Sequence, residues 1–156
     1  DGADNPQQMP AILQSRLMRE LAVSATATNP YLTGVFLRGL IHVKDAATPQ
    51  NIAVLQQPMT RTGYTVAVSG WLPTLLQSPE GARSLAQESW QALDVPMVLI
   101  WGDQDTVTPL DQAEHIAALA PNASLDVMQG VGHIPQIEAP GAFQAALLAA
   151  LKKLSP

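Results

Sequence analysis

Two short apolar runs, each closed by a glycine, constrain the fold of this 156-residue chain more than any other feature. The first, PMVLIWG at residues 96–102, is typical of a strand that is covered on both faces. The second, SLDVMQG at residues 124–130, is shorter. An amphipathic segment at about 110–120 separates them, and another at about 141–154 follows. This order predicts a βαβα unit with two parallel strands and a right-handed crossover.

Proline marks the predicted helix starts. Pro30, Pro49, Pro79 and Pro109 each directly follow Asn, Thr or Ser, and a proline at the first helical position loses no hydrogen bond while the preceding side chain caps the helix. These pairs predict helix starts at about residues 30, 49, 79 and 109. A helix is also expected over about 64–75, with Pro73 kinking or ending it. Apolar helix faces are predicted at Leu13, Leu17, Met18 and Leu21, and at Phe143, Leu147, Leu151 and Leu154.

The composition excludes several classes of partner. With 47% hydrophobic and 13% charged residues, the chain is expected to form a packed core. The net charge is −5 and no basic cluster exceeds the pair Lys152–Lys153, so no nucleic-acid partner is expected. No apolar run approaches the roughly 18 residues of a membrane span. The chain has no cysteine, and its three histidines show no metal-ligand spacing, so no metal site is expected.

The predicted elements divide the chain into a helical segment at residues 1–92 and a βαβα segment at residues 93–156. Two parallel strands alone make a poor sheet, because both of them are edges. We therefore expect further strands to come from elsewhere. The chain opens at Asp1 without an initiator methionine, which favours a polypeptide that was processed or cut from a longer one.

Polar residues follow both predicted strands. Asp103 and Asp105 come directly after the first strand, and His133 follows the second. Because the carboxyl ends of parallel strands meet at one edge of a sheet, we expect these side chains to lie close together. A carboxylate beside an imidazole fixes the tautomer of the ring and stabilises the imidazolium, as the orienting half of a nucleophilic triad does.

The stretches VPMVLIWGDQDTVTP and ASLDVMQGVGHIPQIEAPGAF together resemble the C-terminal part of an α/β-hydrolase, with its strands 7 and 8. The resemblance implies an α/β fold in which Asp105 is the triad acid and His133 the catalytic base. It implies that residues 1–92 are the helical cap, inserted after strand 6, and that residues 93–156 belong to the core. No nucleotide, flavin or metal cofactor is implied.

The nucleophile of that family is missing from the sequence. It belongs on an upstream G-x-S-x-G elbow, and the chain contains no such motif. Ser69, in AVSGW, lacks the first glycine, while Ser84, Ser89 and Ser124 fall within predicted helices or a strand. The oxyanion loop also belongs upstream. We therefore expect the chain to be inactive by itself and to find its nucleophile in another segment.

Three residues are candidates for binding a small apolar, ester-like substrate. Val107 and Ile134 flank the acid and the base, and under the family geometry they would line an apolar pocket. Trp71, in the helical segment, is either a core residue or faces an acyl or aromatic group.

The remaining polar residues have structural interpretations. Asp103 is expected to be a turn residue. Glu138 is expected to cap the last helix or to hold the histidine loop. His115 is expected to be a solvated residue on the polar face of its helix, four residues after Asp111, and His42 is structural or exposed.

Three functions remain open at this point. The first is an ester hydrolase whose serine nucleophile lies outside the chain. The second keeps the fold with an aspartate nucleophile, as in haloalkane dehalogenases and epoxide hydrolases; there the triad acid can follow strand 6, which would make Asp1 or Asp4 relevant. The third is a non-catalytic fragment that associates through its strand edges with the missing N-terminal half or with a second copy of itself.

Overall fold

The computed structural model describes residues 10–76 and 81–154. The chain divides into two compact units. The first comprises Asp1–Phe36 and Ile52–Ala82, and the second comprises Leu37–Asn51 and Arg83–Pro156. The expected boundary between a cap at 1–92 and a core at 93–156 stays a prediction, because compactness does not test which residues form a cap.

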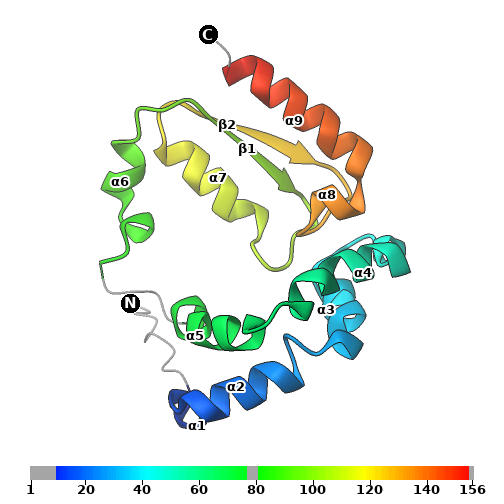
Figure 1. Ribbon diagram of the computed structural model, residues 1–156. Helices are drawn as coiled ribbons and strands as arrows, with labels where there is room; N and C mark the ends of the chain where they lie inside the picture. The colour runs from blue at the N-terminus through cyan, green and yellow to red at the C-terminus, as the bar shows by residue number, and fades with distance from the viewer. Residues whose placement is uncertain (1–9, 77–80, 155–156) are drawn as a thin grey trace. The chain divides into compact units, whose positions relative to one another are not determined.

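The second unit contains the predicted βαβα arrangement. Strands β1 (Met97–Gly102) and β2 (Ala123–Met128) pair in parallel, in a register that joins Met97 to Ala123 and Gly102 to Met128. Helices α7 (Leu110–Leu119) and α9 (Pro140–Leu154) pack against the strands and lie on either side of them (Figure 1). Because both strands end at the same edge, the loops that follow them also meet there.

The second unit also holds short helical turns around this sheet. Their bounds are η2 (Lys44–Ala46), η4 (Arg83–Leu85), α6 (Gln87–Gln91) and α8 (Pro135–Glu138). Its buried apolar residues are small or medium in size and include Leu37, Ile41, Ala113, Met128, Val131 and Ala150. The described residues before β1 form helices and turns without strands, as predicted.

The first unit is helical, with α2 packed against α5 (Figure 1). Its elements are α1 (Ala11–Gln14), α2 (Arg16–Ala25), η1 (Pro30–Leu32), η3 (Gln57–Thr60) and α5 (Tyr64–Leu76). Helices α3 (Thr33–Leu40) and α4 (Pro49–Gln56) each run from one unit into the other along the chain. No helix among the described residues has the length and apolarity needed to cross a bilayer.

The proline pairs predicted two of the four helix starts correctly. The Asn29 side chain accepts a hydrogen bond from the Tyr31 amide at the start of η1, and Thr48 caps α4 through the Asn51 amide. The start expected near residue 79 lies outside the described residues. At residue 109 the prediction was off by one position: α7 begins at Leu110, because the Thr108 hydroxyl donates to Asp105 and does not cap the helix.

The helix expected over about 64–75 is present as α5, which continues past Pro73 to Leu76. Of the two expected effects of Pro73, ending the helix is therefore wrong, and kinking it stays a prediction. Proline has no N–H, so the carbonyl of Ser69, four residues earlier, loses its helical donor. Arg19 of α2 supplies a replacement: its Nε donates to the Ser69 carbonyl at 3.3 Å. The packing of α2 on α5 thus satisfies the group that Pro73 leaves without its helical partner.

Much of the predicted apolar surface of the helices remains exposed. On α2, Leu17 and Leu21 are 64% and 53% exposed, and Val23 is the buried residue. On α9, Leu147 and Leu151 are 40% and 52% exposed. The periodicity correctly located apolar stripes, but the described residues leave large parts of them uncovered.

Candidate active site

Asp105 and His133 form a hydrogen-bonded pair at the carboxyl edge of the two strands. The Nδ1 atom of His133 lies 2.9 Å from Oδ2 of Asp105. The Asp105 side chain is 5% exposed, whereas that of His133 is 32% exposed. The carboxylate is therefore shielded from water, while the ring reaches the surface. With Nδ1 occupied by Asp105, proton transfer to or from another group falls to Nε2.

The loop after β1 surrounds the Asp105 carboxylate with donors. Oδ1 accepts hydrogen bonds from the backbone N–H groups of Val107 and Thr108 at 2.8 and 2.9 Å. Oδ2 accepts the Thr108 hydroxyl at 2.7 Å. Burial raises the pKa of Asp105, but the donors of Thr108, His133 and Val107 outweigh it and hold the pKa below its ordinary value. Asp105 therefore stays ionised and can stabilise a positive charge on the ring.

Sequence reasoning missed the role of Thr108. Its hydroxyl lies 2.7 Å from Oδ2 of Asp105 and 3.3 Å from Nδ1 of His133, so it contacts both members of the pair. The pair Thr108-Pro109 instead predicts that Thr108 caps α7. The missed signal was the spacing D-x-x-T, since an aspartate commonly accepts hydrogen bonds from residues two and three positions ahead in a turn.

Further contacts hold the two loops together. The indole Nε1 of Trp101 donates to the Thr108 carbonyl at 2.8 Å. Asp103 is a turn residue as expected, and its Oδ1 accepts the Gly130 amide at 2.7 Å. The Gln104 amide donates to the Val131 carbonyl at 2.9 Å. The acid loop and the histidine loop are therefore joined independently of the Asp105–His133 contact.

Glu138 holds the histidine loop, which confirms one of its two expected roles. It is buried, and its Oε2 accepts the Gly132 amide at 3.0 Å while Oε1 accepts the Ile134 amide at 3.1 Å. Oε2 also accepts the amides of His42 and Val43. Burial raises the pKa of Glu138, but the four amides together hold it below its ordinary value.

Gly102 and Gly132 allow the backbones of this region to approach closely. A Cβ on Gly102 would meet the carbonyl oxygens of Val131 and Gly132, and a Cβ on Gly132 would lie 2.6 Å from the His42 nitrogen. These neighbours are backbone atoms, which cannot rotate away as a flexible side chain can. A side chain at either position would therefore push the site apart.

We expect the Gly102→Ala variant to lose about 3 kcal/mol of unfolding free energy, since the new methyl group overlaps two carbonyl oxygens. Urea denaturation followed by circular dichroism measures this loss. Gly141→Ala is the matched control: it lies in α9 with nothing within 4 Å of its added Cβ, so its stability should stay unchanged or rise by up to about 1 kcal/mol. Equal stability of the two variants would refute the close approach.

A pocket of about 260 Å³ adjoins the Asp105–His133 pair. Its lining includes both residues together with Thr108, Gly132, Trp101 and Phe143. Val107 and Ile134, proposed as substrate contacts, are not among its lining residues: Val107 is 45% exposed, and the Ile134 amide donates to Glu138. Trp71 is 56% exposed and belongs to the other compact unit. The substrate roles of these three residues stay predictions.

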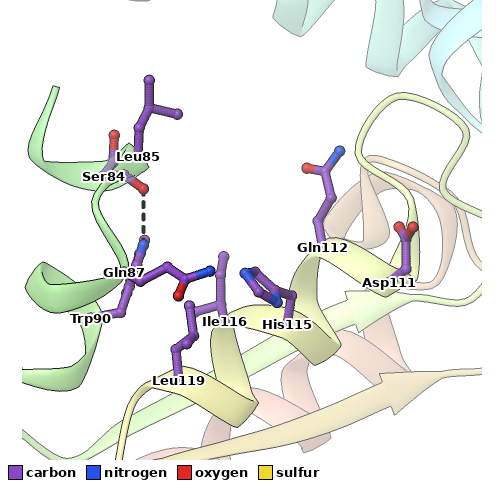
Figure 2. Close-up of a pocket in the computed structure, with 9 residues that line it drawn as sticks. All are labelled: Ser84, Leu85, Gln87, Trp90, Asp111, Gln112, His115, Ile116 and Leu119. Atoms are coloured by element: carbon purple, nitrogen blue, oxygen red, sulfur yellow. Dashed lines mark hydrogen bonds between the residues drawn. The ribbon is translucent and has the colours of Figure 1, made fainter. Parts of the chain in front are cut away.

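A larger concavity of about 560 Å³ lies elsewhere in the second unit, between α7 and the residues around α6 (Figure 2). Trp90 lines it with its indole Nε1 donating to the Ser84 carbonyl at 2.9 Å, and His115 and Asp111 line it from α7. His115 is exposed, as expected. The pocket of about 260 Å³ is the better candidate active site, although it is the smaller of the two. It contains the buried Asp105 carboxylate and the His133 imidazole, and the larger concavity does not.

None of the described serines is hydrogen bonded to His133. Ser69, the serine nearest to the family motif in sequence, is 2% exposed and donates its hydroxyl to the Val66 carbonyl at 2.8 Å. It is a buried helical serine and not an available nucleophile. Within the part of the chain that the structure describes, no three His, Cys, Asp or Glu side chains form a group that could hold a metal ion.

Comparisons with known proteins show the family to which the chain belongs. A family model described as alpha/beta hydrolase fold matches residues 35–140. The putative hydrolase LipZ of Mycobacterium tuberculosis is 36% identical over 122 residues, which are 76% of this chain and 42% of LipZ. Protein ABHD14A of Rattus norvegicus is 32% identical over 94 residues, covering 53% of this chain and 38% of that protein. The chain thus spans well under half the length of these relatives.

Solved structures show the same fold. A thermophilic esterase from Thermogutta terrifontis superposes with a TM-score of 0.68 at 19% identity, covering 96% of this chain and 53% of the esterase. The meta-cleavage product hydrolase CumD gives a TM-score of 0.60 at 18% identity, covering 80% of this chain and 46% of CumD. The expected fold class, a helical segment followed by the C-terminal βαβα part of such a hydrolase, is confirmed.

Proposed function

We propose that this chain, which belongs to the alpha/beta-hydrolase fold family, supplies the acid and the base of an enzyme that hydrolyses esters or related carbonyl compounds. The observation that carries the proposal is the 2.9 Å contact between His133 Nδ1 and Asp105 Oδ2 at the ends of adjacent parallel strands. Similarity to proteins named lipase and esterase favours ester substrates.

In the proposed reaction, His133 transfers the protons. Asp105 keeps the proton of the neutral ring on Nδ1, which leaves the lone pair of Nε2 free to accept a proton from the attacking hydroxyl group. The imidazolium formed in that step is stabilised by the buried Asp105 carboxylate. Nε2 then donates the proton to the leaving alcohol, and the same ring activates water to release the acid.

We further propose that the nucleophile and the oxyanion donors lie outside this chain. The sequence has no G-x-S-x-G motif, and Ser69 is buried with its hydroxyl occupied. The relatives are more than twice as long as the matched segments, which leaves room for the missing groups. The exposed leucines of α9 and the two unpaired strand edges suit a larger sheet. We refer to the protein that contains this chain together with its nucleophile as the parent protein.

Within the parent protein, residues 1–92 are proposed to act as a cap over the substrate and residues 93–156 as part of the core. Trp71, Val107 and Ile134 are proposed to contact a small apolar acyl group, which the exposed side chains of Trp71 and Val107 could cover. Hydrolysis of 4-nitrophenyl butyrate by the parent protein, measured with and without His133, tests the proposal. Turnover that does not depend on His133 would refute it.

We expect the Thr108→Val variant of the parent protein to lose about tenfold in kcat/KM. Valine keeps the size of the side chain and both backbone donors to Asp105, but it removes the hydroxyl that lies 2.7 Å from Oδ2. Steady-state ester hydrolysis measures the loss. Thr108→Ser keeps the hydroxyl and should stay within about twofold of the unaltered protein. If valine and serine behave alike, the hydroxyl does not orient the pair.

A further inference from the structure

Four backbone amides from two distant segments converge on the Glu138 carboxylate. Oε2 accepts the amides of His42, Val43 and Gly132 at 2.8, 2.9 and 3.0 Å, and Oε1 accepts the amide of Ile134 at 3.1 Å. A carboxylate offers about four acceptor sites, so Glu138 is close to saturated. Such an arrangement is far more than the capping of a short helix requires.

Two of these amides lie directly on either side of His133. Gly132 and Ile134 are its chain neighbours. The bond from the Ile134 N–H holds the peptide group that follows His133, and the bond from the Gly132 N–H holds the peptide group between Val131 and Gly132, one residue before His133. On the ring itself, Nδ1 lies 2.9 Å from Asp105 Oδ2 and 3.3 Å from the Thr108 hydroxyl. The ring is therefore positioned through its backbone by one carboxylate and through its side chain by another.

The other two amides belong to the segment between α3 and η2. This segment is held by the buried Ile41 and by Lys44, whose ammonium group donates to the carbonyls of Arg38 and Ile41. Gly132 brings it near the histidine loop, because the absence of a Cβ there leaves room for the backbone nitrogen of His42. Glu138 itself lies 96 and 95 residues after His42 and Val43, and it thus joins two segments that are distant in sequence.

We propose that Glu138 is a positioning residue that couples the His42–Val43 segment to the orientation of His133. The inference rests on the proposed function, because orientation matters only where His133 transfers protons. Since the two segments share Oε2, a change in the position of His42 or Val43 alters the hydrogen bond that holds Gly132. Residues 42 and 43 therefore influence catalysis without touching the reacting atoms.

The Glu138→Gln variant of the parent protein tests the role of the carboxylate. Glutamine keeps the size of the side chain, but its NH2 group faces at least one backbone N–H that now has no acceptor. We expect kcat for 4-nitrophenyl butyrate to fall about tenfold with KM within about twofold, because the loss concerns proton transfer and not binding. Glu114→Gln, at an exposed position on α7, is the matched control and should leave kcat unchanged.

The Val43→Pro variant tests the coupling without altering Glu138 or the histidine loop. Proline removes one donor from Oε2, and the φ of −78° at Val43 is one that proline adopts. We expect a fall in kcat of about threefold or more, together with faster amide hydrogen exchange in the peptide that contains Gly132 and Ile134. Exchange in α7 and α9 should stay unchanged.

These results separate the inference from the proposed function. If the rate of amide hydrogen exchange around Gly132 is unchanged in Val43→Pro, the coupling is overturned, whether or not kcat falls. Faster exchange with unchanged kcat in both variants would overturn the positioning role. If a His133 variant retained turnover, the proposed function would fail, and the exchange result would still decide whether Glu138 joins the two segments. Should Glu138→Gln not fold, Val43→Pro alone decides the inference.

Discussion

We expect the His133→Asn variant of the parent protein to lose at least about 1,000-fold in kcat/KM for 4-nitrophenyl butyrate. Asparagine can still donate a hydrogen bond toward Asp105, so the buried carboxylate keeps a partner. It has no group that accepts a proton from the nucleophile at neutral pH. The loss should therefore appear in the acylation step, and single-turnover ester hydrolysis measures it directly.

The control for this variant is His115→Asn. His115 is exposed on α7 and lies away from the pocket beside Asp105, so its replacement should leave kcat/KM unchanged. Thermal unfolding should be similar for both variants, because the His133 side chain is one-third exposed. Retention of turnover by His133→Asn, with folding intact, would exclude His133 as the base.

The second large effect is expected for Asp105→Asn, with a loss of about 100- to 10,000-fold in kcat. The two backbone amides that bond Oδ1 would select the amide oxygen for that position, which leaves the NH2 group facing His133 Nδ1. An NH2 donor stabilises the ring tautomer with its proton on Nε2. That tautomer cannot accept a proton from a nucleophile, so geometry is kept while the base is lost.

Asp103→Asn is the matched control, only two residues away in the same loop. Its Oδ1 accepts the Gly130 amide, and an asparagine oxygen can accept the same bond. We expect its kcat to stay within about threefold of the unaltered protein. Equal rates for the two variants at neutral pH would be inconsistent with a tautomer-fixing role for Asp105.

The strands and the Asp105–His133 contact could be predicted from sequence because each depends on a local pattern. An apolar run closed by glycine located β1 at Met97–Gly102, and the parallel register brought the following loops together. The Asp105 carboxylate and the His133 imidazole, which follow the two strands, were therefore expected at the same edge of the sheet. Neither the position of the strand nor this contact depends on how the helices pack.

The other contacts of the site depend on competition that a sequence does not display. Thr108 could cap a helix or bond Asp105, and the buried carboxylate was the stronger acceptor. Nothing in the sequence near His42 indicates that its amide meets Glu138. Pro73 lies inside α5, where Arg19 of α2 donates a hydrogen bond to the Ser69 carbonyl that Pro73 leaves without its helical donor. The contacts of Glu138 and Pro73 thus depend on residues distant in sequence, whereas Thr108 had two local hydrogen bonds to choose between.

Apolar periodicity likewise located helix faces without showing what covers them. The leucines of α9 follow the predicted spacing, yet Leu147 and Leu151 remain 40% and 52% exposed. A two-stranded sheet covers only part of a helix of 15 residues. This exposure agrees with the proposal that the parent protein adds strands to the sheet.

The central claim is that Asp105 and His133 activate a nucleophile that is not among residues 1–156. Labelling of the parent protein with a fluorophosphonate, followed by peptide mass spectrometry, locates that nucleophile directly. The account predicts one modified serine outside this chain, with labelling lost in His133→Asn. A phosphonyl adduct on Ser69 or another serine of this chain, or labelling that is independent of His133, would contradict it.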